Sequence, residues 1–145
     1  MAERQPGVIR MARTDEEVLR CFPVMHELRP HLSEADFLQR VRRQEAAGYA
    51  LAFLEQDGAV RAAAGFRLLD NLASGRVLYV DDLVTLPADR SGGCGAELFS
   101  WLTEQARAAG CATLELDSGV QRFGAHRFYF GRRMFISSYH FRLPL

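Results

Sequence analysis

The sequence has little of what marks membrane, secreted or zinc-binding proteins. No apolar run approaches the roughly 18 to 20 residues that a membrane-spanning helix requires. The first six residues lack the apolar core of a secretory signal peptide. Cys21, Cys94 and Cys111 are odd in number and form no Cys-x-x-Cys pair, which argues against a disulfide framework and a structural zinc site. We therefore expect a cytoplasmic protein whose cysteines are reduced and mostly packed.

The chain also lacks an excess of charge of either sign. Eighteen Lys plus Arg balance eighteen Asp plus Glu, so no overall field attracts a nucleic-acid backbone or an anionic membrane. Neither is expected as a partner. No repeat, low-complexity tract or linker divides the 145 residues, of which 48% are hydrophobic and 25% charged. This composition is typical of a soluble globular protein, and we expect one domain over residues 1–145.

Helix caps and hairpin signals give a coarse order of elements. Thr14-Asp-Glu-Glu17 and Ser33-Glu-Ala-Asp36 predict helices that begin near Asp15 and after Ser33, the first kinked or divided at Pro23. Asp57-Gly58 between two apolar runs predicts an antiparallel hairpin. Later helices are expected at Gly95–Ala109 and Arg122–Arg132, and strands at Val8–Ala12, Tyr49–Glu55, Ala59–Leu69, Arg76–Leu86, Cys111–Leu116 and Phe135–Phe141. The order predicts an α/β fold with a mixed sheet, with hairpins first and crossover helices later.

A glycine-rich segment follows the strand that ends at Thr85. Arg90-Ser-Gly-Gly93-Cys-Gly95 opens a helix, where glycines let the backbone approach a ligand and unpaired N–H groups form an anion site suited to a pyrophosphate. The segment lacks the Gly-Lys-Ser/Thr ending of a P-loop, and Leu98 occupies the third glycine position of a dinucleotide fingerprint. The alternative interpretation is a junction that uses glycine only to turn.

Two motifs resemble those of a known family. Arg90-x-x-Gly93-x-Gly95 resembles the acetyl-coenzyme A motif of the GCN5-related N-acetyltransferase (GNAT) superfamily, and Ala125-His-Arg-Phe-Tyr129 resembles its downstream Ala-x-x-Phe/Leu-Tyr segment. The resemblance covers nearly the whole chain. It implies an α/β (α+β), GNAT-like fold with a mixed, mostly antiparallel central sheet of six to seven strands flanked by about four helices.

The resemblance also implies how acetyl-coenzyme A binds. Backbone groups of three strand residues would pair with the pantetheine arm as an added strand, and the loop would wrap the pyrophosphate. The cofactor residues implied are Leu83, Val84, Thr85, Arg90, Ser91, Gly92, Gly93, Cys94, Gly95 and Ala96. Arg90 is otherwise a surface arginine on a polar turn. The family chemistry needs no metal.

The resemblance further implies the catalytic groups. Tyr129 matches the tyrosine that commonly protonates the departing thiolate; alternatively it only packs between Phe128 and Phe130. Asp81 lies where related enzymes carry the group that accepts the amine proton. Strand alternation predicts that Asp81 and Asp82 point to opposite faces, and Asp82 is a candidate contact to a cationic substrate. The alternative for both is a structural carboxylate paired with an arginine.

The residues that contact the acceptor, and the role of one residue that departs from the family pattern, are less clearly indicated by the sequence. Glu27, with Asp82 and Asp117, is expected to contact the substrate, and His26 and His31 are further candidates. Arg122 stands seven residues before Tyr129, where the family frequently has Asn; either it binds phosphate instead or it does not touch the cofactor.

The resemblance predicts an enzyme that moves the acetyl group of acetyl-coenzyme A to a primary amine of a small molecule or peptide in a ternary complex. The alternative is a non-catalytic acyl-coenzyme A sensor with the same fold. Many relatives dimerise near the C-terminus, and the apolar segment Phe135–Phe141 makes a homodimer plausible.

Overall fold

The computed structural model describes residues 5–145, except for the side chain of Ser91. The chain forms two compact units, a larger one that ends at Glu115 and a smaller one from Leu116 to Leu145. Each unit is described by itself. In the described part of the chain, no helix is both long enough and apolar enough to cross a membrane.

The larger unit is built on a twisted sheet with strands in sequence order. The order is β1 (Val8–Met11), β2 (Ala50–Gln56), β3 (Ala59–Asn71), β4 (Gly75–Thr85) and β5 (Thr113–Leu116), and the first three neighbouring pairs are antiparallel. Asp57 and Gly58 join β2 to β3, and their φ values of 54° and 75° are those of a two-residue type I′ turn. The predicted hairpin is therefore confirmed.

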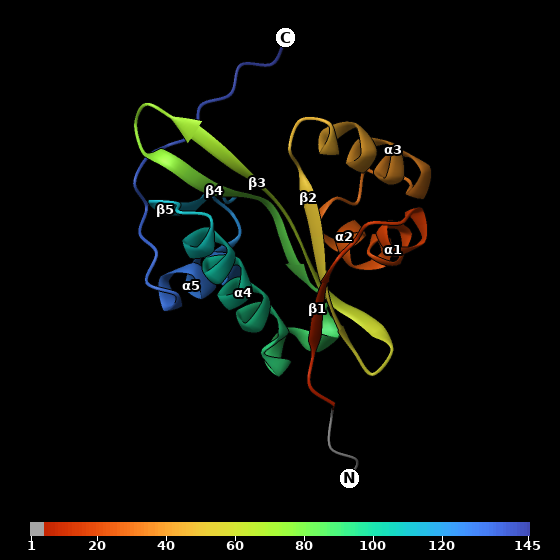
Figure 1. Ribbon diagram of the computed structural model, residues 1–145. Coiled ribbons are helices and arrows are strands. Elements are labelled where there is room, and N and C mark those ends of the chain that lie inside the picture. The colour runs from red at the N-terminus through yellow and green to blue at the C-terminus, as the bar shows by residue number, and fades with distance from the viewer. Residues whose placement is uncertain (1–4) are drawn as a thin grey trace. The chain divides into compact units, whose positions relative to one another are not determined.

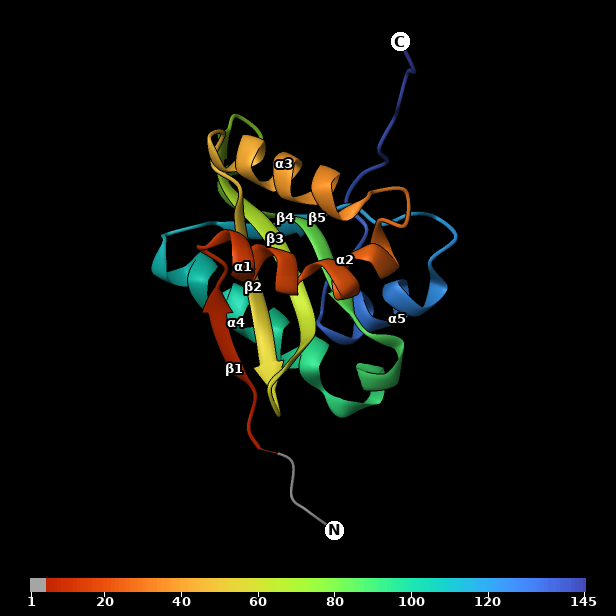
Figure 2. The same ribbon diagram turned by 90° about the vertical axis from the view of Figure 1, so that its right-hand side faces the viewer.

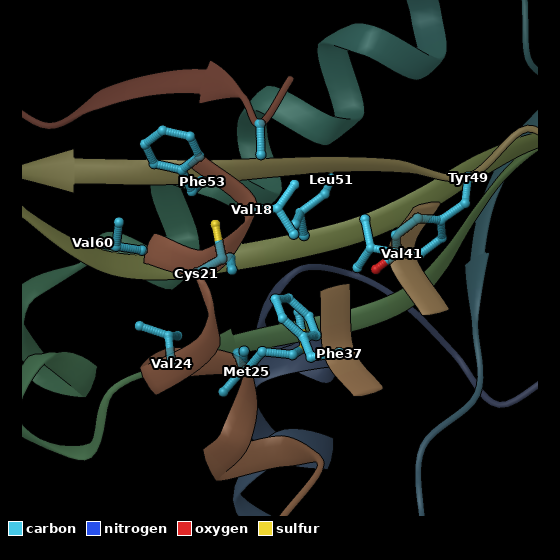
Figure 3. Close-up of a cluster of buried hydrophobic side chains, with 13 residues drawn as sticks. Val18, Cys21, Val24, Met25, Phe37, Val41, Tyr49, Leu51, Phe53 and Val60 are labelled. Carbon is cyan, nitrogen blue, oxygen red and sulfur yellow. The ribbon is translucent and has the colours of Figure 1, made fainter. Parts of the chain in front are cut away.

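Three helices cover one face of this sheet, as Figures 1 and 2 show: α1 (Asp15–Arg20), α2 (Phe22–Leu28) and α3 (Glu34–Glu45). Thr14 and Glu17 form a complete capping box for α1, and Ser33 caps α3. Pro23 lies in the first turn of α2, where a missing N–H costs no hydrogen bond, so the predicted helix is two short helices. Their apolar side chains pack on Leu51 and Phe53 of β2 and on their neighbours (Figure 3).

The opposite face of the sheet is covered by α4 (Cys94–Ala108), as Figures 1 and 2 show. Leu98 and Leu102 of α4 are fully buried, as are Ala52 and Leu54, which alternate along β2 with the residues of the first face. Burial on both faces explains why β2 reads as a continuous apolar run.

Cys21, Cys94 and Cys111 are all free thiols, and burial raises the pKa of Cys21 to about 12.

The smaller unit contains α5 (Phe123–Gly131), close to the predicted helix. The predicted strand Phe135–Phe141 is wrong, because residues 134–145 form neither helix nor strand. Its apolar pattern has no strand partner among the described residues, and a strand needs a neighbour to satisfy its backbone groups. The described sheet consequently has five strands instead of six to seven, while the mixed α/β fold class is confirmed.

Candidate functional site

The predicted phosphate loop contains more regular structure than expected. Residues Pro87–Gly92 form a short 3-10 helix, η1, and Gly93 joins it to α4 with φ 81° and ψ 4°. This left-handed conformation suits glycine, which has no Cβ to clash. None of the described side chains caps α4, so its first backbone N–H groups, which lack intrahelical acceptors, can bind an anion.

The residues implied to hold the cofactor form two short runs that are close in the sequence, one at the end of β4 and one from η1 into α4. Leu83, Val84 and Thr85 end β4 and pair on one side with β3. On the other side, Ala112 donates to the carbonyl of Arg76 at 2.8 Å, so the four-residue β5 begins beside the start of β4 and is too short to reach its last residues. Within the larger unit, β5 therefore does not extend beside residues 83–85, where the added strand is predicted.

The loop side chains differ in exposure. Arg90 is exposed on η1, Cys94 is buried, and Gly95 and Ala96 form the first turn of α4. Gly92 ends η1. The backbone of Ser91 belongs to η1, but its side chain lies outside the described residues. The loop thus presents backbone and one exposed guanidinium.

A buried carboxylate, which the sequence reasoning missed, anchors η1. Asp89 is 2% exposed, and its Oδ2 has no hydrogen-bond partner in the described chain. Its nearest opposite charge is Nη1 of Arg61 on β3, 3.6 Å away. Because a buried charge is stable only near a compensating one, this pair ties the loop to the sheet.

A β-bulge changes the predicted directions of the two aspartates. Gly65 of β3 pairs with Asp82, while the next residue, Phe66, pairs with Val80, so Asp81 is an extra residue in β4. The prediction that Asp81 and Asp82 point to opposite faces was wrong, since both line one cavity. Simple alternation fails where a strand carries an inserted residue.

The cavity lies in the larger unit and has a volume of about 400 Å³. Its walls come from α2, α3, the turn between them, the start of β2 and the bulged part of β4. The charged and polar lining residues are Arg29, His31, Arg40, Gln44, Tyr49, Tyr79, Asp81 and Asp82, and the apolar ones are Met25, Leu32, Phe37 and Val41. Its size and mixed lining are those of a small-molecule site.

Both aspartates are held by arginines. Arg67 donates to the two carboxylate oxygens of Asp81 at 3.0 and 2.7 Å, and Arg29 donates to Oδ1 of Asp82 at 3.0 Å from Nε and lies 2.9 Å from it through Nη2. Tyr49 donates its hydroxyl to Oδ2 of Asp82 at 2.9 Å. Burial raises the pKa of Tyr49 well above its ordinary value, and the charge of Asp82 adds to this. Arg67 also bonds Gln44 at 3.0 Å.

Gly65 makes this network possible. A Cβ built on Gly65 meets the Tyr49 hydroxyl at 1.8 Å and its ring carbons at 2.3 and 2.6 Å. Only glycine therefore lets Tyr49 cross β3 at the bulge and reach Asp82. Neither Gly65 nor Tyr49 was a predicted site residue, because nothing local in the sequence connects them to residues 81 and 82.

The other predicted acceptor contacts are dispersed. Glu27 is exposed on α2 and is not among the residues that line the cavity, and His26 packs on Phe22 instead. His31 does line the cavity. Asp117 belongs to the smaller unit, where Oδ1 lies 3.5 Å from Nδ1 of His140.

Tyr129 lies on α5 of the smaller unit, beside Phe128, whose ring centroid is 5.7 Å away. Burial raises the pKa of Tyr129, and the nearby Arg122 charge partly opposes this rise. The phenol is therefore protonated at neutral pH, as a proton donor must be. Arg122, at the position where Asn is frequent in the resembled family, contacts this tyrosine.

Comparisons with known proteins agree on one family. The model of the acetyltransferase (GNAT) family matches residues 11–132. The uncharacterized N-acetyltransferase YhdJ of Bacillus subtilis is 36% identical over 139 residues, which cover 94% of this chain and 98% of that protein. Aminoalkylphosphonate N-acetyltransferase of Salmonella typhimurium is 42% identical over 50 residues, 34% of this chain and 32% of that protein.

A solved structure of aminoglycoside N-acetyltransferase AAC(6')-Iy in complex with coenzyme A has a similar fold. Its TM-score is 0.85 at 13% sequence identity, and the match covers 99% of this chain and 97% of that one. At this identity the likeness shows the fold alone.

Proposed function

Because the chain belongs to the acetyltransferase (GNAT) family and is an acetyl-coenzyme A-dependent N-acetyltransferase, we propose that it moves the acetyl group directly to the primary amine of a small molecule or peptide. Both substrates are bound at once in a ternary complex. The observation that supports this most is the Arg90-to-Gly95 motif, which opens α4 shortly after the end of β4, with no cap from a described side chain.

Acetyl-coenzyme A is the proposed donor. The pantetheine amides pair with Leu83, Val84 and Thr85, and the pyrophosphate lies on the loop from Arg90 to Ala96. A backbone N–H near Val84 or Thr85 then stabilises the negative charge that develops on the thioester oxygen. The contribution of the loop is mainly orientation, since its backbone groups are fixed by η1 and α4.

The acceptor is proposed to bind in the 400 Å³ cavity, where its nitrogen attacks the thioester carbon. The C–S bond breaks, the sulfur keeps the electron pair, and Tyr129 gives it a proton. The attacking nitrogen loses a proton as the amide forms, and this proton, through water, restores the Tyr129 phenol. The ammonium form of the amine must first lose a proton, for which Asp81, directly or through water, is the proposed acceptor. Each Asp81 oxygen already accepts one bond from Arg67 and retains a lone pair for another donor.

Asp82, Glu27 and Asp117 are the proposed acceptor contacts. Asp82 has the strongest support because it lines the cavity, and Arg29 and Tyr49 fix its position. An amine acceptor also fits the name of one similar protein, an aminoalkylphosphonate N-acetyltransferase that matches 50 residues of this chain.

The experiment that tests this function combines calorimetry with thiol release. Acetyl-coenzyme A is titrated into the protein, and free thiol is then measured across a panel of amines and lysine-bearing peptides. The sequence contains no lysine, so self-acetylation of lysine side chains does not contribute to the signal. Binding with amine-dependent release is expected, whereas binding with no release across the panel would favour the acyl-coenzyme A sensor.

The variant Tyr129→Phe tests the proton donor in the same assay. We expect kcat to fall about 100-fold or more, the lower end of general acid–base contributions, with acetyl-coenzyme A affinity unchanged. The control is Tyr139→Phe, which removes a phenol that is 82% exposed in the segment after α5. Unchanged turnover in Tyr129→Phe would remove Tyr129 from the mechanism.

Three coarser expectations accompany this proposal: one domain over residues 1–145, a cytoplasmic location and a homodimer. The family match over residues 11–132 spans both compact units, which supports one domain. Phe135 and Phe141 are 81% and 91% exposed, which supports a partner surface near the C-terminus. Light scattering of the purified protein tests the dimer.

A further inference from the structure

Arginines in and around the cavity outnumber its two aspartates: Arg29 and Arg40 line it, and Arg67, which does not line it, pairs with Asp81. Arg67 pairs with Asp81 and Arg29 with Asp82, so each carboxylate has its own cation. Arg40 lines the same cavity from α3, and no hydrogen bond or ion pair joins it to another described residue. The guanidinium of Arg40, which is exposed, is therefore unpaired among the described residues.

The carboxylates nevertheless keep acceptor capacity for an ammonium group. A carboxylate offers about four lone-pair sites. Arg67 uses one on each oxygen of Asp81, Arg29 occupies Oδ1 of Asp82, and Tyr49 uses one on Oδ2 of Asp82, which keeps a free lone pair. The β4 wall can thus accept hydrogen bonds from an amine.

Arg40 offers a different kind of contact from the α3 wall. Its planar guanidinium presents paired N–H donors that match the two oxygens of a carboxylate or a phosphonate. A second ammonium group there would meet like charge. Arg29, whose side chain is 41% exposed, adds positive charge near the end of α2. Amine recognition and acid recognition therefore come from separate elements around one small cavity.

We propose that the acceptor is a small zwitterion, in which the amine and an acid group, a carboxylate or a phosphonate, are carried on one short chain. The amine is held by Asp81 and Asp82, and the acid group by Arg40. This inference rests on the proposed function for the identity of the cavity as the acceptor site. A volume of about 400 Å³ lies near the lower end for ligand pockets, which fits a short acceptor.

The test compares acceptors that differ only in their second group. Propylamine, 1,3-diaminopropane, 4-aminobutyrate and 3-aminopropylphosphonate are assayed by thiol release, and each rate is corrected for the fraction of neutral amine. We expect kcat/KM for one or both acids to exceed that for propylamine by about 10- to 100-fold, as charged hydrogen bonds contribute. The two acids also distinguish carboxylate from phosphonate recognition.

Arg40→Gln supplies the matched variant. It is expected to lower kcat/KM for the preferred acid about 10-fold more than it lowers kcat/KM for propylamine. Arg43→Gln is the control, because Arg43 is exposed on the same helix and does not line the cavity. Equal or better rates with 1,3-diaminopropane, or an acid preference that survives Arg40→Gln, would overturn the proposal.

A binding measurement separates this inference from the proposed function. The same four compounds are titrated calorimetrically into the protein saturated with coenzyme A, in which no acetyl transfer occurs. Tighter binding of the acids that depends on Arg40 supports the zwitterion even if no compound releases thiol, a result that would count against the enzyme mechanism alone. Turnover of plain amines without a preference for the acids would support the enzyme mechanism and overturn the zwitterion proposal.

Discussion

The proposed cofactor loop and the proposed acceptor cavity are built in different ways. The loop is one continuous stretch from Leu83 to Leu98, and it offers mainly backbone groups. The cavity is made of side chains from α2, α3, β2 and β4, and the Arg29–Asp82 pair spans 53 residues of sequence. A site made of backbone groups can be predicted from residues that are neighbours in the sequence. A site made of side chains depends on which distant segments the fold brings together.

Two glycines, one in the loop and one beside the cavity, are required for different reasons. Gly93 is needed for its conformation, with φ 81° and nothing within 4 Å of a built Cβ. Gly65 is needed for space, since the Tyr49 ring occupies the position of its Cβ. Substituting each glycine by alanine should therefore damage one site through strain and the other through collision.

The largest effect is expected for Gly65→Ala. The added methyl displaces Tyr49, and loss of the hydrogen bond to Asp82 accompanies the steric cost. Overpacking and loss of a bond to a charged group together predict a decrease of about 3 kcal/mol in the free energy of unfolding. Urea denaturation measures it, and the amine KM should rise while acetyl-coenzyme A affinity changes little.

The double variant Gly65→Ala with Tyr49→Ala serves as its control. If the collision is the cause, removal of the ring makes the added methyl nearly harmless, and the two changes are strongly non-additive. Additive losses of stability would show that Gly65 is required for another reason.

Asp89→Asn tests whether the loop really depends on backbone alone. The substitution keeps the shape of the side chain but removes the charge that faces Arg61 from a site only 2% exposed. We expect a loss of about 2 kcal/mol, below the range for fully buried pairs because Arg61 is partly exposed. Coenzyme A affinity, measured by calorimetry, should fall several-fold as η1 shifts.

Asp70→Asn is the matched control, since Asp70 is exposed on β3 and should change stability by less than about 0.5 kcal/mol. If Asp89→Asn and Asp70→Asn behave alike, the buried pair does not anchor the loop.

Gly93→Ala should have a smaller effect on stability and a specific effect on the cofactor. A left-handed conformation costs a residue with a Cβ about 1 to 2 kcal/mol, and relaxation of that strain moves the start of α4. Gly75→Ala has the same cost at φ 76° at the first residue of β4, also with nothing near the built Cβ. Calorimetry should show weaker coenzyme A binding for Gly93→Ala only; equal affinities would separate Gly93 from the cofactor site.

The same contrast explains what the sequence predicted. The capping box at Thr14, the Asp57-Gly58 turn and the glycine-rich loop are local signals, and each lies where the pattern indicated. The bulge at Asp81 was missed because it is a property of the pairing between β3 and β4. For the same reason the network around Asp82 was not predictable, although its aspartates were named. The strand Phe135–Phe141 failed because its pattern requires a neighbouring strand edge that no local signal supplies.

The smallest effect we expect is an alkaline loss of stability caused by Tyr49. Burial and the charge of Asp82 raise its pKa well above about 10, so the phenol ionises first in the unfolded chain. Its contribution is fully present below pH 10 and is lost as pH rises toward the folded-state pKa, by about 0.8 kcal/mol at pH 10.5. Urea denaturation between pH 8 and pH 10.5 measures this slope, and no lysine titrates in this range to obscure it. Tyr49→Phe should reduce the slope and leave the parts due to Cys21 and Tyr129, whose pKa values are also raised by burial. If the wild-type protein and Tyr49→Phe had identical slopes, Tyr49 would ionise as easily in the folded protein as in water. The cavity would then not shield the Tyr49 hydroxyl from solvent.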